Sequence, residues 1–291
     1  MIVSYYLIQT LNALSFSVLL LLTGLGLSLV LSLMSFVNLA HGSFFLLGGY
    51  IAITWLAGGA PWWLALPAAF VLTGAVGLIL DRLVFARFYA RAHLMQVLLT
   101  YGISVVFADL MRWGFGAETL SPALPEFLRG VVFVAGLPFP LYRLVIIACG
   151  LALAAVLWWS LDRTLWGAAL RACVADRGIV ETLGIDTRRM LTVGMALAAA
   201  LGGLGGALGA GMLSAYPGLD EEVLLLALLV VVIGGLGNFR GVVAGALLLG
   251  FVSTFARVWL PELSNLLTLA VMAGLLIARP TGLLASRERT V

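Results

Sequence analysis

The sequence predicts an all-α protein, a polytopic transmembrane helical bundle of about eight or nine spans with broken helices and one cytoplasmic coupling helix. Of the 291 residues, 63% are hydrophobic and only 10% are charged, whereas soluble domains carry about 25% charged residues. The mean hydropathy is +1.16. Apolar runs long enough to cross a bilayer recur along the whole chain. We therefore expect residues 1–291 to form a single transmembrane domain.

The expected spans are apolar runs separated by turns or charged segments, and each crossing needs about 20 mostly apolar residues. Two of the runs are short and lie beside polar, Gly-containing breaks. The runs are Tyr5–Met34, Ser43–Ala57, Trp62–Leu80, Gln96–Met111, Tyr142–Leu161, Met190–Leu213, Val223–Ile233, Val242–Val258 and Leu263–Ala278.

Arginine is distributed unevenly between the connecting segments, and this predicts the orientation. The segment Arg82–Arg91, residues 162–190 and the tail Arg279–Val291 are rich in arginine and are expected in the cytoplasm. The acidic loop Asp220–Glu222 and the long loop Arg112–Leu141 are then external. The spans alternate consistently if the N-terminus is outside and the C-terminus is cytoplasmic.

All 16 basic side chains are arginine, and the sequence contains no lysine. A Walker A loop needs a lysine that reaches the β- and γ-phosphates, so the chain cannot hold an ATP site of that kind. If ATP drives this protein, another polypeptide binds it, and we expect no enzyme activity in this chain. The formal charge of +3 is too small to indicate nucleic acid. Two cysteines, Cys149 and Cys173, predict neither a disulfide framework nor a metal site, and no cofactor is expected.

Residues 162–190, the most charged segment, have the pattern of a cytoplasmic helix. From Gly167 to Leu183, alanines and other apolar residues recur at helical spacing, with charges of both signs on the remaining surface. Gly184 is placed to end this helix. A face of small residues is suited to a groove on a partner protein. The alternative is a helix on the lipid surface, which favours basic residues opposite bulky apolar ones.

Two polar breaks interrupt the apolar runs, and their residues are candidates for the translocation path. Polar groups at membrane depth are costly without partners, so these residues either line the path or hold the junction of a broken helix. For Asn38 and His41, capping of helix ends is the alternative. The lone histidine has no second ligand cluster, so no metal site is expected. The candidates are Asn38, His41 and Gly42 in the first break, and Gly237, Asn238 and Gly241 in the second.

Three long motifs, in a consistent order and spacing, and a short closing motif carry a resemblance to a known family. Phe36–Tyr50 reads FVNLAHGSFFLLGGY, Ile233–Gly250 reads IGGLGNFRGVVAGALLLG, and the chain closes with RPTGL at Arg279–Leu283. The remaining motif is R-A-x-x-x-D followed by L-G-I-D, formed by Arg171, Ala172, Asp176, Leu183, Gly184, Ile185 and Asp186. Together they resemble the permeases of ABC importers, more narrowly the branched-chain amino-acid (LivH-type) family, over nearly the whole chain. Glu181 departs from the family, which more often has a small residue there.

The resemblance implies a permease subunit that takes branched-chain or other hydrophobic amino acids, or similar small solutes such as urea and amides, into the cytoplasm. It implies that Arg171, Ala172, Asp176, Leu183, Gly184 and Ile185 couple the permease to an ATPase. The implied partners are a second permease subunit, similar or identical, two cytoplasmic ABC ATPase subunits, an external solute-binding protein and the lipid of a bacterial inner membrane.

Two other classes of function are open to test from the residues alone. An ion-coupled secondary transporter usually has ionisable residues deep in its spans, and the expected spans contain almost none. Asp109 and Arg112 are better explained as a neutralised i,i+3 pair than as a proton relay. An intramembrane hydrolase would rest on Ser43 near His41, but side chains two residues apart do not face each other on a helix.

Overall fold

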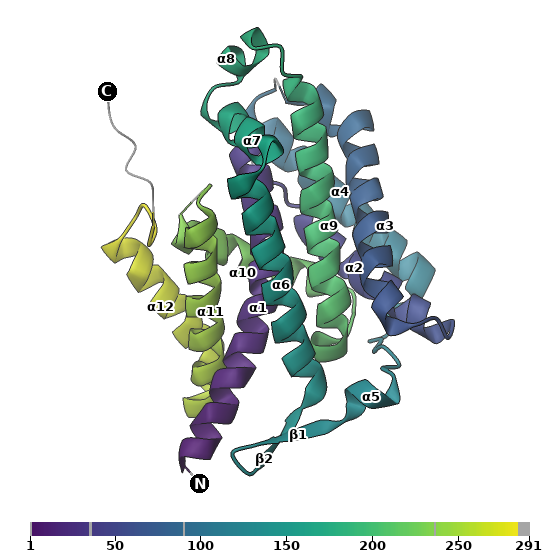
Figure 1. Cartoon of the computed structure of the whole chain (residues 1–291), viewed down its shortest axis with the longest axis vertical. Helices are drawn as coiled ribbons and strands as arrows, with labels where there is room; N and C mark the ends of the chain where they lie inside the picture. Colours follow the sequence, from purple (N-terminus) through teal and green to yellow (C-terminus); the bar gives the residue numbers. More distant parts are fainter. Residues whose placement is uncertain (1, 35–36, 90, 236, 285–291) are drawn as a thin grey trace.

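The computed structural model describes residues 2–34, 37–89, 91–235 and 237–284, and almost all of its elements are helices (Figure 1). Its α-helices are α1 (Ile2–Met34), α2 (His41–Ala57), α3 (Trp62–Leu83), α4 (His93–Phe115), α5 (Glu126–Arg129), α6 (Leu141–Arg163), α7 (Leu165–Ala175), α8 (Arg177–Thr182), α9 (Thr187–Leu213), α10 (Leu219–Gly234), α11 (Phe239–Trp259) and α12 (Ser264–Ala278). Strand β1 (Val131–Val134) pairs antiparallel with β2 (Leu137–Pro140). The predicted helical bundle is confirmed, with one small hairpin added.

Each of the nine expected apolar runs contains a helix, but the helices differ in length. Seven are long and apolar enough to cross a membrane: α1, α3, α4, α6, α9, α11, and α12 with the turn before it. Helices α2 and α10 have 17 and 16 residues. At 1.5 Å per residue they extend about 25 Å, less than the roughly 30 Å hydrocarbon core of a bilayer. These two short helices adjoin the two polar breaks, as the broken-helix prediction requires.

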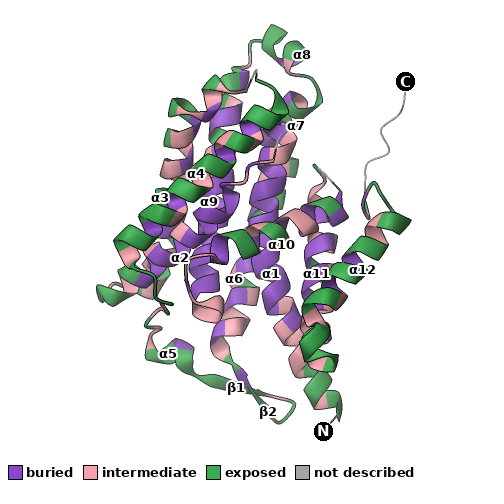
Figure 2. Cartoon of the chain, turned by 180° about the vertical axis from the view of Figure 1, so that it is seen from behind, coloured by how far each residue is buried: buried purple, intermediate pink, exposed green. Residues whose placement is uncertain are grey.

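Helices α1 and α9 form the centre of the bundle. In each of them, 83% of the most apolar stretch is buried, against 11% to 44% in the other five long helices. Helix α9 contacts α1, α2 and α3, and α1 also contacts α6, α10 and α11. Figure 2 shows buried residues concentrated along α1 and α9, while α3 and α12 expose much of their surface. The outer helices therefore present apolar side chains outward, as lipid-facing helices do.

The close packing around α9 depends on glycine. A Cβ atom at Gly206 would overlap the Phe45 carbonyl of α2, and one at Gly203 would overlap the Thr73 side chain of α3. On α2, a Cβ atom at Gly48 would overlap the backbone of Gly203. In lipid, the hydrophobic effect does not drive helices together, so close backbone approach at small residues supplies much of the attraction. The glycines of this span thus bring the α9 backbone directly against that of α2 and let the Thr73 side chain of α3 pack onto the α9 backbone.

The bundle has two distinct ends, which we call the coupling end and the hairpin end. Helices α7 and α8 form the coupling end, and α5 with the β1–β2 hairpin forms the hairpin end (Figure 1). Helix α1 begins at the hairpin end, and α12 runs away from it toward the coupling end. The long segment Arg112–Leu141, expected as a plain loop, therefore contains both a short helix and the hairpin. Which side of the membrane each end faces stays a prediction.

Two further local predictions are wrong. Asp220–Glu222 is the first turn of α10 and not a loop, and Asp220 is buried with 4% of its surface exposed. Carboxylates are favourable at that position because the helix dipole is positive there. The expected single helix from Gly167 to Leu183 is divided at Asp176, whose side chain accepts a hydrogen bond from the Ile179 N–H and caps α8. Aspartate favours such capping turns over the interior of a helix.

We predict that Gly206→Ala lowers the free energy of unfolding by about 1–3 kcal/mol, because the added methyl group must displace the α2 backbone. Unfolding in detergent, followed by circular dichroism, measures the loss. The matched control is Gly102→Ala on α4, where an added Cβ meets nothing within 4 Å. Alanine has the higher helix propensity, so the control should be neutral or slightly stabilising. Equal stability of the two variants would contradict the packing argument.

Candidate functional site

Helix α7, which carries the first half of the predicted coupling motif, is attached to the end of α6. The Thr164 hydroxyl accepts a hydrogen bond from the Gly167 N–H at 3.1 Å and caps α7. The Arg171 guanidinium donates to the Leu161 carbonyl of α6. A Cβ atom at Gly167 would overlap the backbone of Leu161, so the two helices are in direct backbone contact. A force applied to α7 is therefore transmitted to α6.

Helix α8 is attached to α9 in a similar way. The Thr187 hydroxyl, in the first turn of α9, donates to the Glu181 carboxylate at 2.6 Å. Asp186 caps α9 by accepting a hydrogen bond from the Arg189 N–H at 3.0 Å. Gly184 has a φ of +77° and follows the end of α8, as predicted for a C′ glycine. Glu181, the residue that departs from the family pattern, thus forms the bond between α8 and α9.

The coupling end exposes apolar side chains. Leu183 is 72% exposed, Ile179 is 60% exposed and Leu165 is 91% exposed. On the opposite face of these helices, Cys173 and Val180 are buried, and burial raises the pKa of the Cys173 thiol. Of the other predicted coupling residues, Ala172 and Ile185 are half-buried. Exposed apolar side chains grouped outside the spans are typical of a protein–protein contact.

The first polar junction lies deep in the bundle. Asn38 is fully buried, and its Oδ1 accepts a hydrogen bond from the Ala40 N–H at 3.0 Å. His41 is also fully buried, and its Nε2 donates to the Thr23 carbonyl of α1 at 3.0 Å. A Cβ atom at Gly42 would overlap the backbone of α10. His41 and Gly42 therefore bring α2 against α1 and α10, whereas Asn38 bonds within its own turn. The cap residue of α2 is Ala40 and not Asn38 or His41.

The second polar junction connects α10 to α11. Asn238 caps α11, accepting hydrogen bonds from the N–H groups of Arg240 at 3.0 Å and Gly241 at 3.3 Å. Its Nδ2 donates to the Leu284 carbonyl in the segment after α12. A Cβ atom at Gly241 would overlap Gly234, so the two helices approach closely where they join. One asparagine thus holds three segments together.

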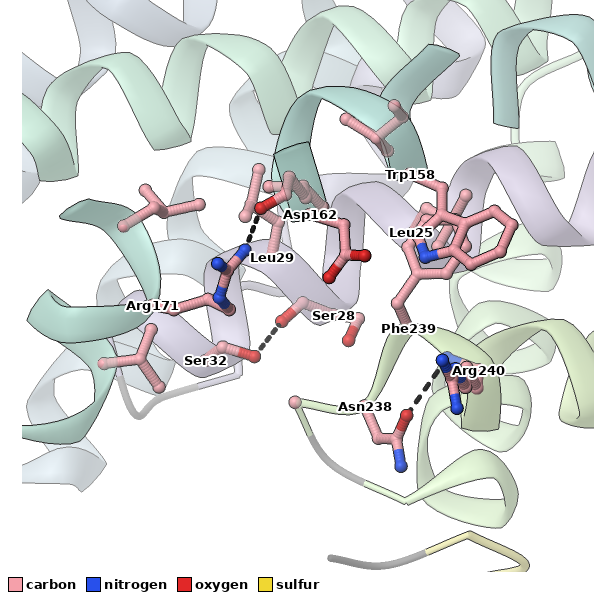
Figure 3. Close-up of a pocket in the computed structure, with 15 residues that line it drawn as sticks. Leu25, Ser28, Leu29, Ser32, Trp158, Asp162, Arg171, Asn238, Phe239 and Arg240 are labelled. Carbon is pink, nitrogen blue, oxygen red and sulfur yellow. Dashed lines mark hydrogen bonds between the residues drawn. The ribbon is translucent and has the colours of Figure 1, made fainter. Parts of the chain in front are cut away.

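A cavity of about 410 Å³ lies between α1, α6, α7 and the start of α11 (Figure 3). Arg171 of the coupling segment lines it, and so do Gly237 and Asn238 of the second junction. The structure therefore brings together residues that the sequence analysis placed in two separate groups, while Asn38, His41 and Gly42 lie elsewhere. Figure 3 shows Arg171 and Asp162 on one side of the cavity and Asn238 and Arg240 on the other. Further lining residues include Leu25, Ser28, Leu29, Ser32, Leu157, Trp158 and Phe239.

Sequence reasoning missed Asp81, a buried carboxylate near the coupling end. It lies at the end of α3, accepts a hydrogen bond from the Thr192 hydroxyl of α9 at 2.6 Å, and accepts another from the Tyr89 hydroxyl. Together with Asp220, it corrects the expectation that the spans bury almost no ionisable groups. The available signal was its position as an acidic residue where an apolar run meets an Arg-rich segment, a position that Asp162 shares.

The residues suggested for a hydrolase are not arranged for nucleophilic catalysis. The Ser43 hydroxyl donates to the Asp220 carboxylate at 3.4 Å, whereas His41 bonds to the Thr23 carbonyl. Within the described residues, no group of three histidine, cysteine or acidic side chains is placed to hold a metal ion. Asp109 and Arg112 form an exposed ion pair at 3.7 Å.

Comparison with known proteins decides the family. Residues 9–278 match the family model of the permease component of branched-chain amino acid transport systems. The chain belongs to this family. It is 26% identical to the high-affinity branched-chain amino acid transport permease BraD of Pseudomonas aeruginosa, covering 98% of this chain and 97% of that one. It is 25% identical to LivH of Escherichia coli K12, with the same coverage. A probable LivH permease of Methanocaldococcus jannaschii is 27% identical over 94% of this chain and 90% of its own.

The predicted LivH-type resemblance is thus confirmed over nearly the full length of the permease. The family consists of transport components and not of enzymes, and the apolar helices of this permease make it an integral membrane protein. The family is one of transport components, and the coupling segment, the two junctions and the cavity are the structural elements that could carry out transport.

We predict that Asn238→Ala loosens both ends of the second junction, at a cost of about 1 kcal/mol for the lost cap. Amide hydrogen exchange should rise at Arg240 and Gly241, and at Leu283 and Leu284, which bond to the end of α10. Asn238→Asp separates the two effects, because its carboxylate still caps α11 but cannot donate to Leu284. The side-chain oxygen is thus assigned to the cap and the side-chain nitrogen to the Leu284 bond. Faster amide exchange at Arg240 and Gly241 in Asn238→Asp than in Asn238→Ala would contradict this assignment.

Proposed function

We propose that this chain is the membrane-spanning permease subunit of an ATP-binding-cassette importer, which translocates branched-chain or other hydrophobic amino acids, or similar small solutes, into the cytoplasm. The observation that carries the proposal is the double attachment of the coupling segment, with α7 bonded to α6 and α8 bonded to α9. The family assignment supports ATP-driven transport over ion-coupled transport.

In this proposal, α7 and α8 contact a cytoplasmic ATPase subunit. Leu165, Ile179 and Leu183 provide the apolar surface for that contact. Arg171 and Asp176 act inside the segment, where Arg171 attaches α7 to α6 and Asp176 caps α8. Closure of two ATPase subunits on ATP would displace the segment as one piece, because caps and side-chain bonds hold both of its helices.

The displacement would reach the cavity directly. Arg171 lines it from α7, and Trp158 and Asp162 line it from α6, so a movement of α6 with α7 changes its width. The opposite wall is formed by the α11 cap at Asn238, which does not belong to the coupling segment. We propose that this cavity is the cytoplasmic portion of the translocation path, widened and narrowed by that relative movement.

The proposed assembly contains a second permease subunit, similar or identical, two ABC ATPase subunits and an external solute-binding protein, in a bacterial inner membrane. The coupling end faces the cytoplasm, because its segments carry most of the arginines. The hairpin end and the N-terminus face outward, and the C-terminus is cytoplasmic. In this orientation, β1, β2 and α5 are placed where an external binding protein would approach.

We predict that Leu183→Asp and Ile179→Asp weaken the contact with the ATPase, because each places a charge in an apolar interface. Co-purification from mild detergent should recover about tenfold less ATPase, the effect of roughly 1.4 kcal/mol, and leucine uptake should fall with it. The control is Val131→Asp, which charges an exposed valine at the opposite end (55% exposed). Full ATPase recovery with both coupling-end variants would remove the basis for this role of α8.

The orientation has its own test. In a variant without Cys149 and Cys173, Glu118→Cys at the hairpin end should react in intact cells with a maleimide that cannot cross the membrane. Arg87→Cys, exposed near the coupling end, should react only after lysis. The reverse pattern would invert the proposed orientation and with it the direction of coupling.

A further inference from the structure

Besides Arg112 and Arg129, two more arginines lie at the hairpin end, where the positive-inside rule disfavours them. Arg143 is in the first turn of α6, and Arg257 is in the last turn of α11. Both line a cavity of about 200 Å³ beside the beginning of α1, together with Asn12 and Thr254.

Neither arginine has an acidic partner in the part of the chain that the structure describes. The Arg143 guanidinium donates to the Asn12 side-chain carbonyl, and Arg257 lies over the Phe16 ring at 5.7 Å from its centroid. Among the described residues, no carboxylate lies within 4 Å of either guanidinium, although Asp109–Arg112 and Asp186–Arg189 pair elsewhere. A guanidinium has five N–H donors in a fork that matches a carboxylate. Most of these donors are therefore free to bind an anion.

A second cavity, of about 80 Å³, adjoins the first. It shares Phe16, Leu213 and Arg257 with the larger one and is lined by Glu222 as well. The Tyr216 hydroxyl donates to the Glu222 carboxylate at 3.1 Å. The remaining surface is mostly aliphatic and comes from α1 and α10, with Leu19, Leu20, Val223 and Leu226. The two adjoining cavities together thus present a cationic side, an anionic side and an apolar wall.

We propose that these adjoining cavities bind a zwitterionic aliphatic α-amino acid, with its carboxylate at Arg257 and Arg143 and its ammonium group at Glu222. The aliphatic side chain then contacts the leucines of α1 and α10. This inference rests on the proposed function and narrows its solute class, because urea and simple amides carry neither of the two charges. A phosphate of a lipid headgroup is the other anion that would fit the arginine pair.

Protection of a cysteine inside the cavity tests the site directly. Thr254→Cys is introduced into the chain without Cys149 and Cys173, and the permease is purified with its ATPase subunits into nanodiscs. Its alkylation by a small maleimide is timed with L-leucine, with leucinamide, which lacks the carboxylate, and with 4-methylpentanoate, which lacks the ammonium group. L-leucine at ten times its dissociation constant leaves roughly a tenth of the sites free, so alkylation should slow about tenfold. The two analogues should protect far less.

Variants of the arginine decide the mechanism of recognition. Arg257→Gln should abolish the protection by leucine, and Arg257→Lys should retain part of it because the positive charge is kept. The matched control is Arg112→Gln, which removes an exposed arginine already paired with Asp109 and lying outside both cavities. It should leave the protection intact.

Three outcomes would overturn the proposal: no protection by leucine, equal protection by leucinamide, or protection that persists in Arg257→Gln. A different result is alkylation that is slow in phosphatidylglycerol nanodiscs and fast in phosphatidylcholine nanodiscs, with no effect of leucine. That result would show that the arginines bind lipid headgroups and not the amino acid. Leucine uptake by the unmodified transporter in proteoliposomes is measured in parallel. Uptake without cavity protection would reject this site alone, whereas the absence of uptake would reject the proposed function.

Discussion

The backbone contact of α9 with α2 and α3 is the constraint on which the rest of the bundle depends. At Gly206 no side chain separates α9 from α2, and at Gly203 only the Thr73 side chain lies between α9 and α3, so both helices are held against α9 at a distance that a larger residue would forbid. This position carries the start of α2 into the centre of the protein, where Asn38 and His41 are fully buried. Their polar groups then need bonds to α1, to α9 and to the local backbone, because lipid offers none. The break before α2 is therefore a consequence of the close contact between α2 and the glycines of α9.

The same contact divides the molecule into a closely packed part and a part that packs less closely. Helices α2, α3 and α9 form one closely packed body, reinforced at the coupling end by the bond between Asp81 and Thr192. Helices α6 and α11 contact α1 on another side, and the cavity of about 410 Å³ lies between them. Because α7 is bonded to α6 and α8 to α9, the coupling segment connects both parts. A displacement of that segment would therefore move the two parts relative to each other and change the shape of the cavity.

The helices could be predicted from the recurring apolar runs of the sequence. The contacts of single polar residues could not. Apolar runs located the helices, and Gly184 was correctly expected to end α8. Asp176 divided the expected helix because its side chain caps the next turn, a local preference that helical periodicity does not report. Asp81 and Asp220 looked like solvated charges by their neighbours in sequence. Their burial depends on α9 and α2, which adjoin them only in the folded chain. The cavity likewise joins segments far apart in sequence.

The two asparagine junctions show how one local motif acquires two roles. Asn38 and Asn238 each accept a hydrogen bond from the N–H two residues later, both at 3.0 Å, so the turn itself is encoded locally. Asn38 is fully enclosed, with its amide against Met195 of α9, and cannot move without opening the core. Asn238 is half-buried beside the cavity and bonds to the carbonyl of Leu284, whose own N–H bonds to the end of α10. The first junction is therefore suited to fixing the bundle, and the second to adjusting when the cavity changes.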